Sequence, residues 1–276
     1  MTLVSIIIPA YRAQPTLTRA VRSALAQTND NLEVIVVADD QFDYAPQLFH
    51  DGINDDRLRF ASTGRVGSGC HNARNVGLSQ ARGDFIAPLD ADDIYLPRRL
   101  AVLLPIAIAA GAATDNPAIV AETTGAELYR AFDARVERFT LDAAALLDLS
   151  VPLFPLVARE HAEPRLSGIE LGEDFVANLR LIDRLGSLAV CGATLSQYRV
   201  VAGSLAHSDT SARGFEESYT AMIERLESGD KLRLSTKIAA IARDCLIRKR
   251  DFNRAFAKAR LNEPSLDFQT FAARRR

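Results

Sequence analysis

Short runs of β-branched residues alternate with helix-length segments through the first half of this 276-residue chain. This alternation is typical of βα units around a mainly parallel sheet, and no other feature constrains the fold as strongly. It predicts strands at 3–8, 32–38, 58–61, 84–88 and 118–121, and helices at 16–28, 70–82 and 97–110. We therefore expect an α/β fold with a central sheet flanked by helices.

The second half is less periodic. Phe175, Leu179 and Ile182 recur at helical spacing before Gly186, which predicts a helix over 173–185. A further strand is expected at 194–201. Apolar positions in the tail predict two amphipathic helices that meet near residues 249–251.

The net charge of -2 conceals an asymmetry between the tail and the body of the chain. Residues 231–276 contain 13 Lys and Arg against 4 Asp and Glu, a charge of +9, whereas residues 1–230 contain 20 against 31, a charge of -11. A basic tail indicates an anionic partner, which can be a membrane surface, a polyanion or another protein.

Three isolated cysteines indicate neither a disulfide framework nor a zinc site, which fits a reducing cytoplasm. The apolar N-terminus is typical of a first strand rather than a signal peptide, and the apolar stretch 100–113 is too short to cross a membrane. We expect a cytoplasmic protein, with peripheral attachment to the inner face of the membrane as a further expectation.

Polar clusters follow three predicted strands directly, namely Ala10 to Arg12, Asp39-Asp40 and Asp90-Ala91-Asp92-Asp93. Ligands of open α/β sheets bind outside the carboxyl ends of the strands. Parallel strands would bring these clusters to one rim, so we expect a site there.

Three carboxylates within residues 90–93 repel one another unless a cation neutralises them. The small number of oxygen ligands available here favours a magnesium-type ion, which also binds substrate phosphates. Tyr95 and Ala101 at the sixth and twelfth positions of a loop that starts at Asp90 argue against an EF-hand. The alternative is a helix N-cap with solvated acids, and spacing alone leaves both open.

The loop at 63–72 contains Gly67-Ser68-Gly69 before a helix that carries Arg74. Its amides and Arg74 could meet an anion. The loop lacks a complete dinucleotide or P-loop motif, so spacing favours a flexible connector.

Five segments together resemble the inverting glycosyltransferases of family 2, which have the GT-A fold: residues 5–11 (SIIIPAY), 36–40 (VVADD), 73–93 (ARNVGLSQARGDFIAPLDADD), 173–174 (ED) and 198–199 (YR). The resemblance implies a catalytic domain over 1–208, with a nucleotide-binding half to about residue 95 and an acceptor half after it. Residues 209–276 would form a basic helical extension.

The resemblance also implies residue roles. Asp92 would bind Mg²⁺ or Mn²⁺ directly, and His207 lies where some relatives have a further metal or diphosphate contact. Contacts to the donor nucleotide, its diphosphate or its sugar would come from Pro9, Ala10, Tyr11, Arg12, Asp39, Arg74, Asp90, Ala91 and Asp93.

Inversion needs a base that takes the proton of the acceptor hydroxyl. The resemblance maps this role onto Glu173-Asp174, and favours Asp174. An acid in the first turn of a helix is stabilised as its anion, the state that a base requires. Without the resemblance, two ordinary helix acids are an equal alternative.

The resemblance implies transfer of a sugar from a nucleotide-diphosphate sugar, with UDP favoured over GDP or dTDP, to a hydroxyl of a glycan or lipid-linked oligosaccharide. A sugar nucleotidyltransferase is an alternative, although no basic glycine-rich loop follows Pro9. A non-catalytic binding protein is another. For the tail we expect membrane docking or self-association, and we expect no nucleic-acid partner.

Overall fold

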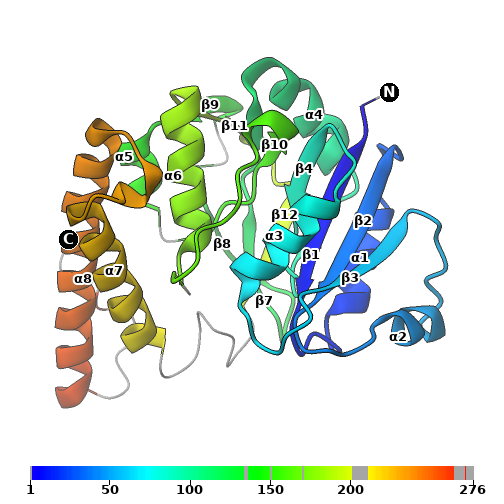
Figure 1. Ribbon diagram of the computed structural model, residues 1–276, viewed down its shortest axis with the longest axis horizontal. Coiled ribbons are helices and arrows are strands. Elements are labelled where there is room, and N and C mark those ends of the chain that lie inside the picture. Colours follow the sequence, from blue (N-terminus) through cyan, green and yellow to red (C-terminus); the bar gives the residue numbers. More distant parts are fainter. Residues whose placement is uncertain are drawn as a thin grey trace.

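The computed structural model describes residues 2–133, 136–149, 151–169, 171–200, 211–263 and 271. Figure 1 shows a mixed α/β arrangement in which β1, β2 and β3 lie at one end of the molecule and α7 and α8 at the other. The predicted α/β class is confirmed.

The main sheet has eight strands in the order β3-β2-β1-β4-β10-β6-β11-β9. β3, β2, β1 and β4 are parallel neighbours, whereas β10 and β9 pair only antiparallel with their neighbours. The sheet is therefore mainly parallel, as expected. Its strands are β1 Val4–Ala10, β2 Leu32–Ala38, β3 Leu58–Ser62, β4 Phe85–Pro88, β6 Ala112–Thr114, β9 Arg138–Leu141, β10 Leu156–Ala158 and β11 Leu188–Cys191.

A second sheet has four strands in the order β5-β12-β7-β8. They are β5 Ile94–Tyr95, β12 Ser196–Val200, β7 Ala118–Ala121 and β8 Glu127–Arg130. The strand predicted at 118–121 forms, but it belongs to this smaller sheet, where it runs parallel to β12.

Eight α-helices occur in the described part of the chain. They are α1 Leu17–Leu25, α2 Ala45–His50, α3 Cys70–Gln80, α4 Arg99–Ala110, α5 Ala143–Leu147, α6 Glu173–Leu185, α7 Ser211–Glu227 and α8 Thr236–Asn262. Short 3₁₀ turns occur at Arg159–His161 and Lys231–Arg233.

The parallel strands carry apolar residues on both faces. Ile6, Ile8 and Val34 belong to a core that also contains buried residues of α1 and α4. Ile7 and Ile35 lie in a separate cluster with residues of α3. At Gly77 of α3 an added Cβ would collide with Ile7, so the missing side chain lets this helix approach the sheet closely.

The tail is part of a further hydrophobic core. Buried residues of α7 and α8, among them Met222, Ala242 and Leu246, cluster with residues of α5 and α6. Figure 1 shows α7 and α8 side by side beyond α6. The extension therefore shares a core with the second half of the chain.

The prediction that two tail helices meet near residues 249–251 is wrong. α8 runs unbroken through Lys249, Arg250 and Asp251, because none of these residues disfavours a helix as Gly or Pro would. The break between the tail helices falls earlier, after α7, where Gly229 lies. Among the described residues, no helix is long and apolar enough to span a membrane.

Candidate functional site

The strand register brings the three polar clusters to one edge of the main sheet. The last residues of β1 and β2, Ala10 and Ala38, are paired, and Asp39 N donates to Ala10 O at 2.8 Å. On the other side of β1, Leu89 N donates to Ile7 O at 3.0 Å. Tyr11, Asp39 and Asp90 therefore follow the same ends of three adjacent parallel strands.

Asp39 is buried and holds the glycine-containing loop at the rim. Its carboxylate accepts hydrogen bonds from Thr63 Oγ1 at 2.7 Å, from Gly69 N at 2.9 Å and from Ser68 Oγ. The loop that spacing favoured as a flexible connector is thus fixed to β2. A carboxylate has about four lone-pair sites, so Asp39 retains capacity for a ligand donor.

Asp40 shapes the turn that follows β1. It accepts from Arg12 N at 2.7 Å and from the Tyr44 hydroxyl at 2.8 Å. Arg12 has a left-handed φ of 50°, and its guanidinium lies 5.2 Å from the centre of the Tyr11 ring. Because 45% of Tyr11 is exposed, an aromatic face is available for stacking on a planar ligand.

The acidic cluster is not a helix cap. α4 begins at Arg99, its N-cap residue is Arg98, and no side chain accepts a capping hydrogen bond there. The fold thus rejects the alternative that spacing left open for residues 90–93.

The three acids of the cluster differ in their partners. Asp90 forms an ion pair with Arg74, and buried Asp93 accepts from Arg199 N at 2.8 Å. Arg19 donates to the carbonyl oxygen of Asp92 at 2.9 Å and not to its carboxylate. Within the described ranges, the Asp92 carboxylate makes no hydrogen bond or ion pair with another side chain.

The cluster carries electrostatic strain. Burial, together with the charge of Asp90, raises the pKa of Asp92 to about 6. Burial and the charge of Asp92 raise the pKa of Asp93 well above the ordinary aspartate value. A bound cation would relieve both effects.

The carboxylates of this cluster fit a hard divalent cation that is bound partly by the protein and partly by substrate phosphates. No group of three His, Cys, Asp or Glu side chains that could hold a metal ion occurs among the residues described. Mg²⁺ needs no such cage, because it keeps several waters and binds one or two carboxylates plus substrate phosphates. Asp92 matches that requirement. His207, named by the resemblance, lies outside the described residues.

Neutralising Asp92 is expected to stabilise the metal-free protein. The folded-state pKa lies above the unfolded value, so folding loses stability as the pH rises from about 4 through 6, and Asp92→Asn removes this loss. At 1.4 kcal/mol per pKa unit the gain at pH 8 is about 1–3 kcal/mol, or roughly 3–10 °C in Tm. Thermal denaturation in EDTA measures it, with Asp56→Asn, an exposed acid, as control. An unchanged or lower Tm for Asp92→Asn would contradict electrostatic strain at Asp92.

Arg74 connects the acidic cluster to α6. Its buried guanidinium forms ion pairs with Asp90 and with Glu173, the first residue of α6, and lies 5.4 Å from the centre of the Phe154 ring. The resemblance placed Arg74 near the donor base or diphosphate. In the structure it lies between two carboxylates.

The two acids at the start of α6, Glu173 and Asp174, differ in their partners. Glu173 is buried and paired with Arg74, whereas Asp174 has no ion-pair partner in the described segments. We expected the first helical turn to favour the Asp174 anion, but burial dominates and raises its pKa, against the opposing charges of Arg74 and Arg165. A raised pKa makes a carboxylate a stronger base.

Sequence reasoning missed a second charged network at the rim. Glu122 accepts from Arg19 at 2.8 and 3.0 Å and also pairs with Arg199. These residues come from α1, the end of β7 and β12. The rule that selected Asp39 and Asp90 would have selected Glu122 too, because it directly follows a strand.

The fold resembles solved structures of the S. aureus protein TarS. Its residues 1–349 in complex with UDP-GlcNAc superpose with a TM-score of 0.67 at 17% identity, covering 98% of this chain and 77% of that one. The complex with UDP gives a TM-score of 0.60 at 14% identity, covering 94% and 92%. The fold is therefore the GT-A fold, with additional C-terminal helices.

Residues 5–151 match the family described as Glycosyl transferase family 2, and the chain belongs to this family. The resemblance drawn from the sequence is confirmed. This chain is 33% identical over 205 residues to the succinoglycan biosynthesis protein ExoO of Rhizobium meliloti, covering 68% of this chain and 56% of ExoO.

It is also 39% identical over 98 residues to WfgD of Escherichia coli, named as a UDP-Glc:alpha-D-GlcNAc-diphosphoundecaprenol beta-1,3-glucosyltransferase. This match covers 36% of the chain and 38% of WfgD. The chain thus spans about half the length of ExoO and less of WfgD, and its relatives include proteins of polysaccharide biosynthesis.

Proposed function

We propose that this protein transfers a sugar, with inversion, from a nucleotide-diphosphate sugar to a hydroxyl of a glycan or lipid-linked oligosaccharide. One observation carries the proposal: Arg74 joins the acidic rim at Asp90 to the start of α6, so that the acids suited to a metal ion and the carboxylate of Asp174 lie around one ion-pair network. The names of WfgD and ExoO support polysaccharide synthesis. UDP is favoured because the TarS structures were solved with UDP and UDP-GlcNAc.

The base is Asp174. It accepts the proton of the acceptor hydroxyl as that oxygen attacks the anomeric carbon, and the bond to the nucleoside diphosphate breaks. Burial keeps the carboxylate basic, while Arg74 and Arg165 provide opposing positive charge nearby. Glu173 is less suited to act as the base, because its carboxylate forms an ion pair with Arg74.

Asp92 would hold Mg²⁺ or Mn²⁺, with Asp93 beside it. When bound, the cation supplies positive charge that stabilises the departing diphosphate. The remaining donor contacts are proposed for the residues around the ends of β1, β2 and β4, where Tyr11 offers its ring and Asp39 an acceptor. These residues are Pro9, Ala10, Tyr11, Arg12, Asp39, Asp90 and Ala91.

A donor panel tests the function. Purified protein is incubated with UDP-, GDP- and dTDP-sugars and either Mg²⁺ or Mn²⁺, and binding and nucleoside diphosphate release are measured. We expect UDP-sugars to bind and to be slowly hydrolysed without acceptor. Binding without turnover, even with lipid-linked acceptors, would indicate a non-catalytic binding protein. No binding of any donor would reject the proposal.

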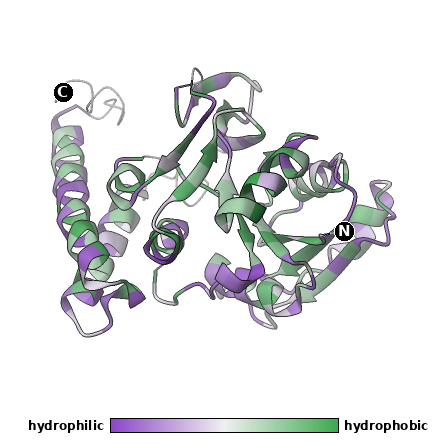
Figure 2. Ribbon diagram, turned by 90° about the horizontal axis from the view of Figure 1, so that it is seen from above, coloured by the Kyte–Doolittle hydropathy of each residue, from purple (hydrophilic) through white to green (hydrophobic). Residues whose placement is uncertain are grey.

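We further propose that α8 docks on an anionic membrane, on the cytoplasmic side, where lipid-linked acceptors lie. Lys237, Arg248 and Lys258 are exposed and recur at intervals close to three helical turns, so they share one face of the helix. Figure 2 shows α8 as a long helix of alternating hydrophilic and hydrophobic residues. Its apolar side packs within the chain, which favours membrane contact over self-association through that side.

Replacing these three residues with glutamine is expected to weaken vesicle binding by roughly 100-fold, at about 1 kcal/mol for each basic residue. Flotation with phosphatidylserine vesicles measures the fraction of protein that is bound to the membrane. A matched variant replaces three exposed arginines of the N-terminal half, Arg65, Arg82 and Arg98, and should bind as the parent does. Equal losses in the two variants would reject α8 as the docking surface.

A further inference from the structure

A cavity of about 70 Å³ lies between α3 and α6, next to β1, β4 and β10. A site needs only about 10–15 Å³ of such volume to hold one water, so this cavity can accept a larger guest. None of Asp90, Asp92 and Asp93 lines it, and it borders the acidic rim only through Arg74, which lines the cavity and pairs with Asp90. Its apolar walls include Ile7, Leu78, Ile86, Val157 and Leu181.

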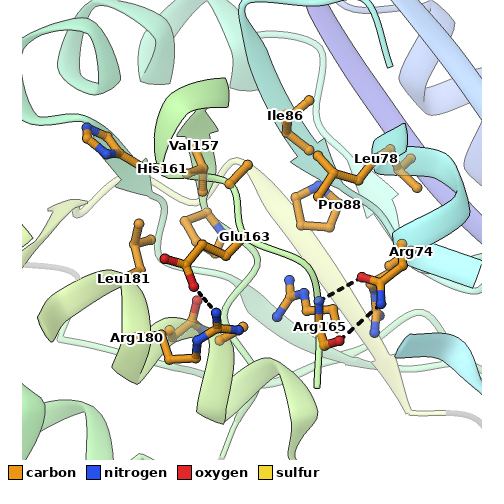
Figure 3. Close-up of a pocket in the computed structure, with 16 residues that line it drawn as sticks. Arg74, Leu78, Ile86, Pro88, Val157, His161, Glu163, Arg165, Arg180 and Leu181 are labelled. Atoms are coloured by element: carbon orange, nitrogen blue, oxygen red, sulfur yellow. Dashed lines mark hydrogen bonds and ion pairs between the residues drawn. The ribbon is translucent and has the colours of Figure 1, made fainter. Parts of the chain in front are cut away.

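The polar part of the lining is mainly basic. It contains three arginines and His161 against a single acid, Glu163. Figure 3 shows Arg180 with Glu163 on one side of the cavity, and Arg74 and Arg165 on the other. Arg74 and Arg180 have carboxylate partners in Glu173 and Glu163, so two of the three guanidinium charges are compensated.

Arg165 is the guanidinium of the three whose side chain has no hydrogen-bonded carboxylate partner in the described residues. Its backbone is fixed by Asn75, with hydrogen bonds of 2.7 and 3.0 Å, yet its side chain makes no hydrogen bond within the described part of the chain. The nearest carboxylate oxygen, Oε2 of Glu173, is 3.6 Å from Nη1, an ion-pair distance too long for a hydrogen bond, while Arg74 binds Oε1 of the same acid. Burial and the charge of Arg74 lower the pKa of Arg165 to about 10.

Unpaired polar atoms, three of them guanidinium N–H donors, concentrate around this cavity. Nine buried side-chain N or O atoms lack a hydrogen-bond partner in the described residues, and four of them belong to its lining: Arg74 Nε, His161 Nδ1, Arg165 Nη1 and Arg180 Nε. Arg74 and Arg180 are only 7% and 8% exposed. Buried unpaired donors are rare, and such a concentration indicates a missing acceptor.

We propose that this cavity binds a phosphate-class oxyanion, with Arg165 as its principal ligand and Arg180 and Arg74 as supporting ones. A guanidinium presents several N–H donors in a fixed fork that matches phosphate oxygens. The unpaired donors come from α3, α6 and the intervening loop, so the guest needs acceptor oxygens in several directions. A tetrahedral oxyanion has them, whereas a water accepts only two hydrogen bonds.

Inorganic phosphate is the probe for this site. In EDTA, which keeps divalent cations from the acidic rim, saturating phosphate is expected to raise Tm by roughly 4 °C over chloride at equal ionic strength. Arg165→Met removes the principal ligand and should lose most of the phosphate effect. Arg184→Gln is the control: Arg184 lies on α6 and pairs with Glu163, as the cavity residue Arg180 does, but it does not line the cavity.

A second variant leaves every arginine in place. Ala177→Leu fills the cavity with hydrocarbon and should abolish the phosphate effect, as Arg165→Met does. If Arg165→Met does not fold, the response of Ala177→Leu alone tests whether phosphate binds in this cavity. The proposal is overturned if phosphate stabilises the parent no more than chloride, or if both cavity variants retain the response of Arg184→Gln.

Discussion

Asp174→Asn is expected to lower kcat by about 10²- to 10⁴-fold while the affinity for the donor changes little, because the amide keeps the shape of the side chain and cannot accept the proton. The pH profile gives a second test. Burial raises the pKa of Asp174, and only the deprotonated form acts as base, so kcat should fall on the acidic side at a pH above the ordinary aspartate pKa. Steady-state rates with donor and acceptor, measured across pH, report both effects.

Two variants control this experiment. Glu160→Gln removes an exposed acid from the segment that precedes α6 and should leave kcat unchanged. Asp174→Glu keeps a carboxylate and should recover part of the lost rate. Full activity of Asp174→Asn with the parent's pH profile would show that another group takes the proton.

Arg74→Met is expected to lower the free energy of unfolding by about 3–5 kcal/mol, the cost of leaving buried charges unpaired. Methionine fills much of the arginine volume, so the loss comes from Asp90 and Glu173 rather than from an empty space. Urea denaturation measures the change, with Arg82→Met, an exposed arginine just beyond α3, as control. A loss no larger than that of the control would show that the ion pairs contribute little.

The double variant Arg74→Met/Glu173→Gln separates charge from packing. Removing the buried acid along with its partner should restore part of the lost stability, so the two effects should not add. Strict additivity would mean that Arg74 and Glu173 act independently, and the link between the rim and α6 would then be incidental.

The regular elements could be predicted where their signal is local. β2 at Leu32–Ala38 and α6 at Glu173–Leu185 form over the predicted residues, because their apolar spacing already defines the buried face. Strands such as β6 and β10 escaped prediction because three residues carry no periodicity. Their pairing is set by neighbours that are distant in the chain.

The acids of the candidate site were found from their positions after strands, a local feature. Their different states were not, because each depends on residues far away in the chain. Asp90 is paired by Arg74, Asp93 accepts from Arg199, and Asp92 has neither kind of partner. The same holds for Glu173 and Asp174, whose adjacent carboxylates differ because Arg74 and Arg165 form ion pairs with Glu173.

By itself, the amino-acid sequence determined the α/β class, the family and the location of the acidic rim, because apolar periodicity and strand ends are encoded within a few residues. Only the tertiary structure decided which acids are paired, that burial raises the pKa of Asp174, and that three arginines line one cavity between α3 and α6. The physical reason is that charge interactions and desolvation depend on distances through space, and folding sets those distances between residues as far as 106 positions apart, as for Asp93 and Arg199.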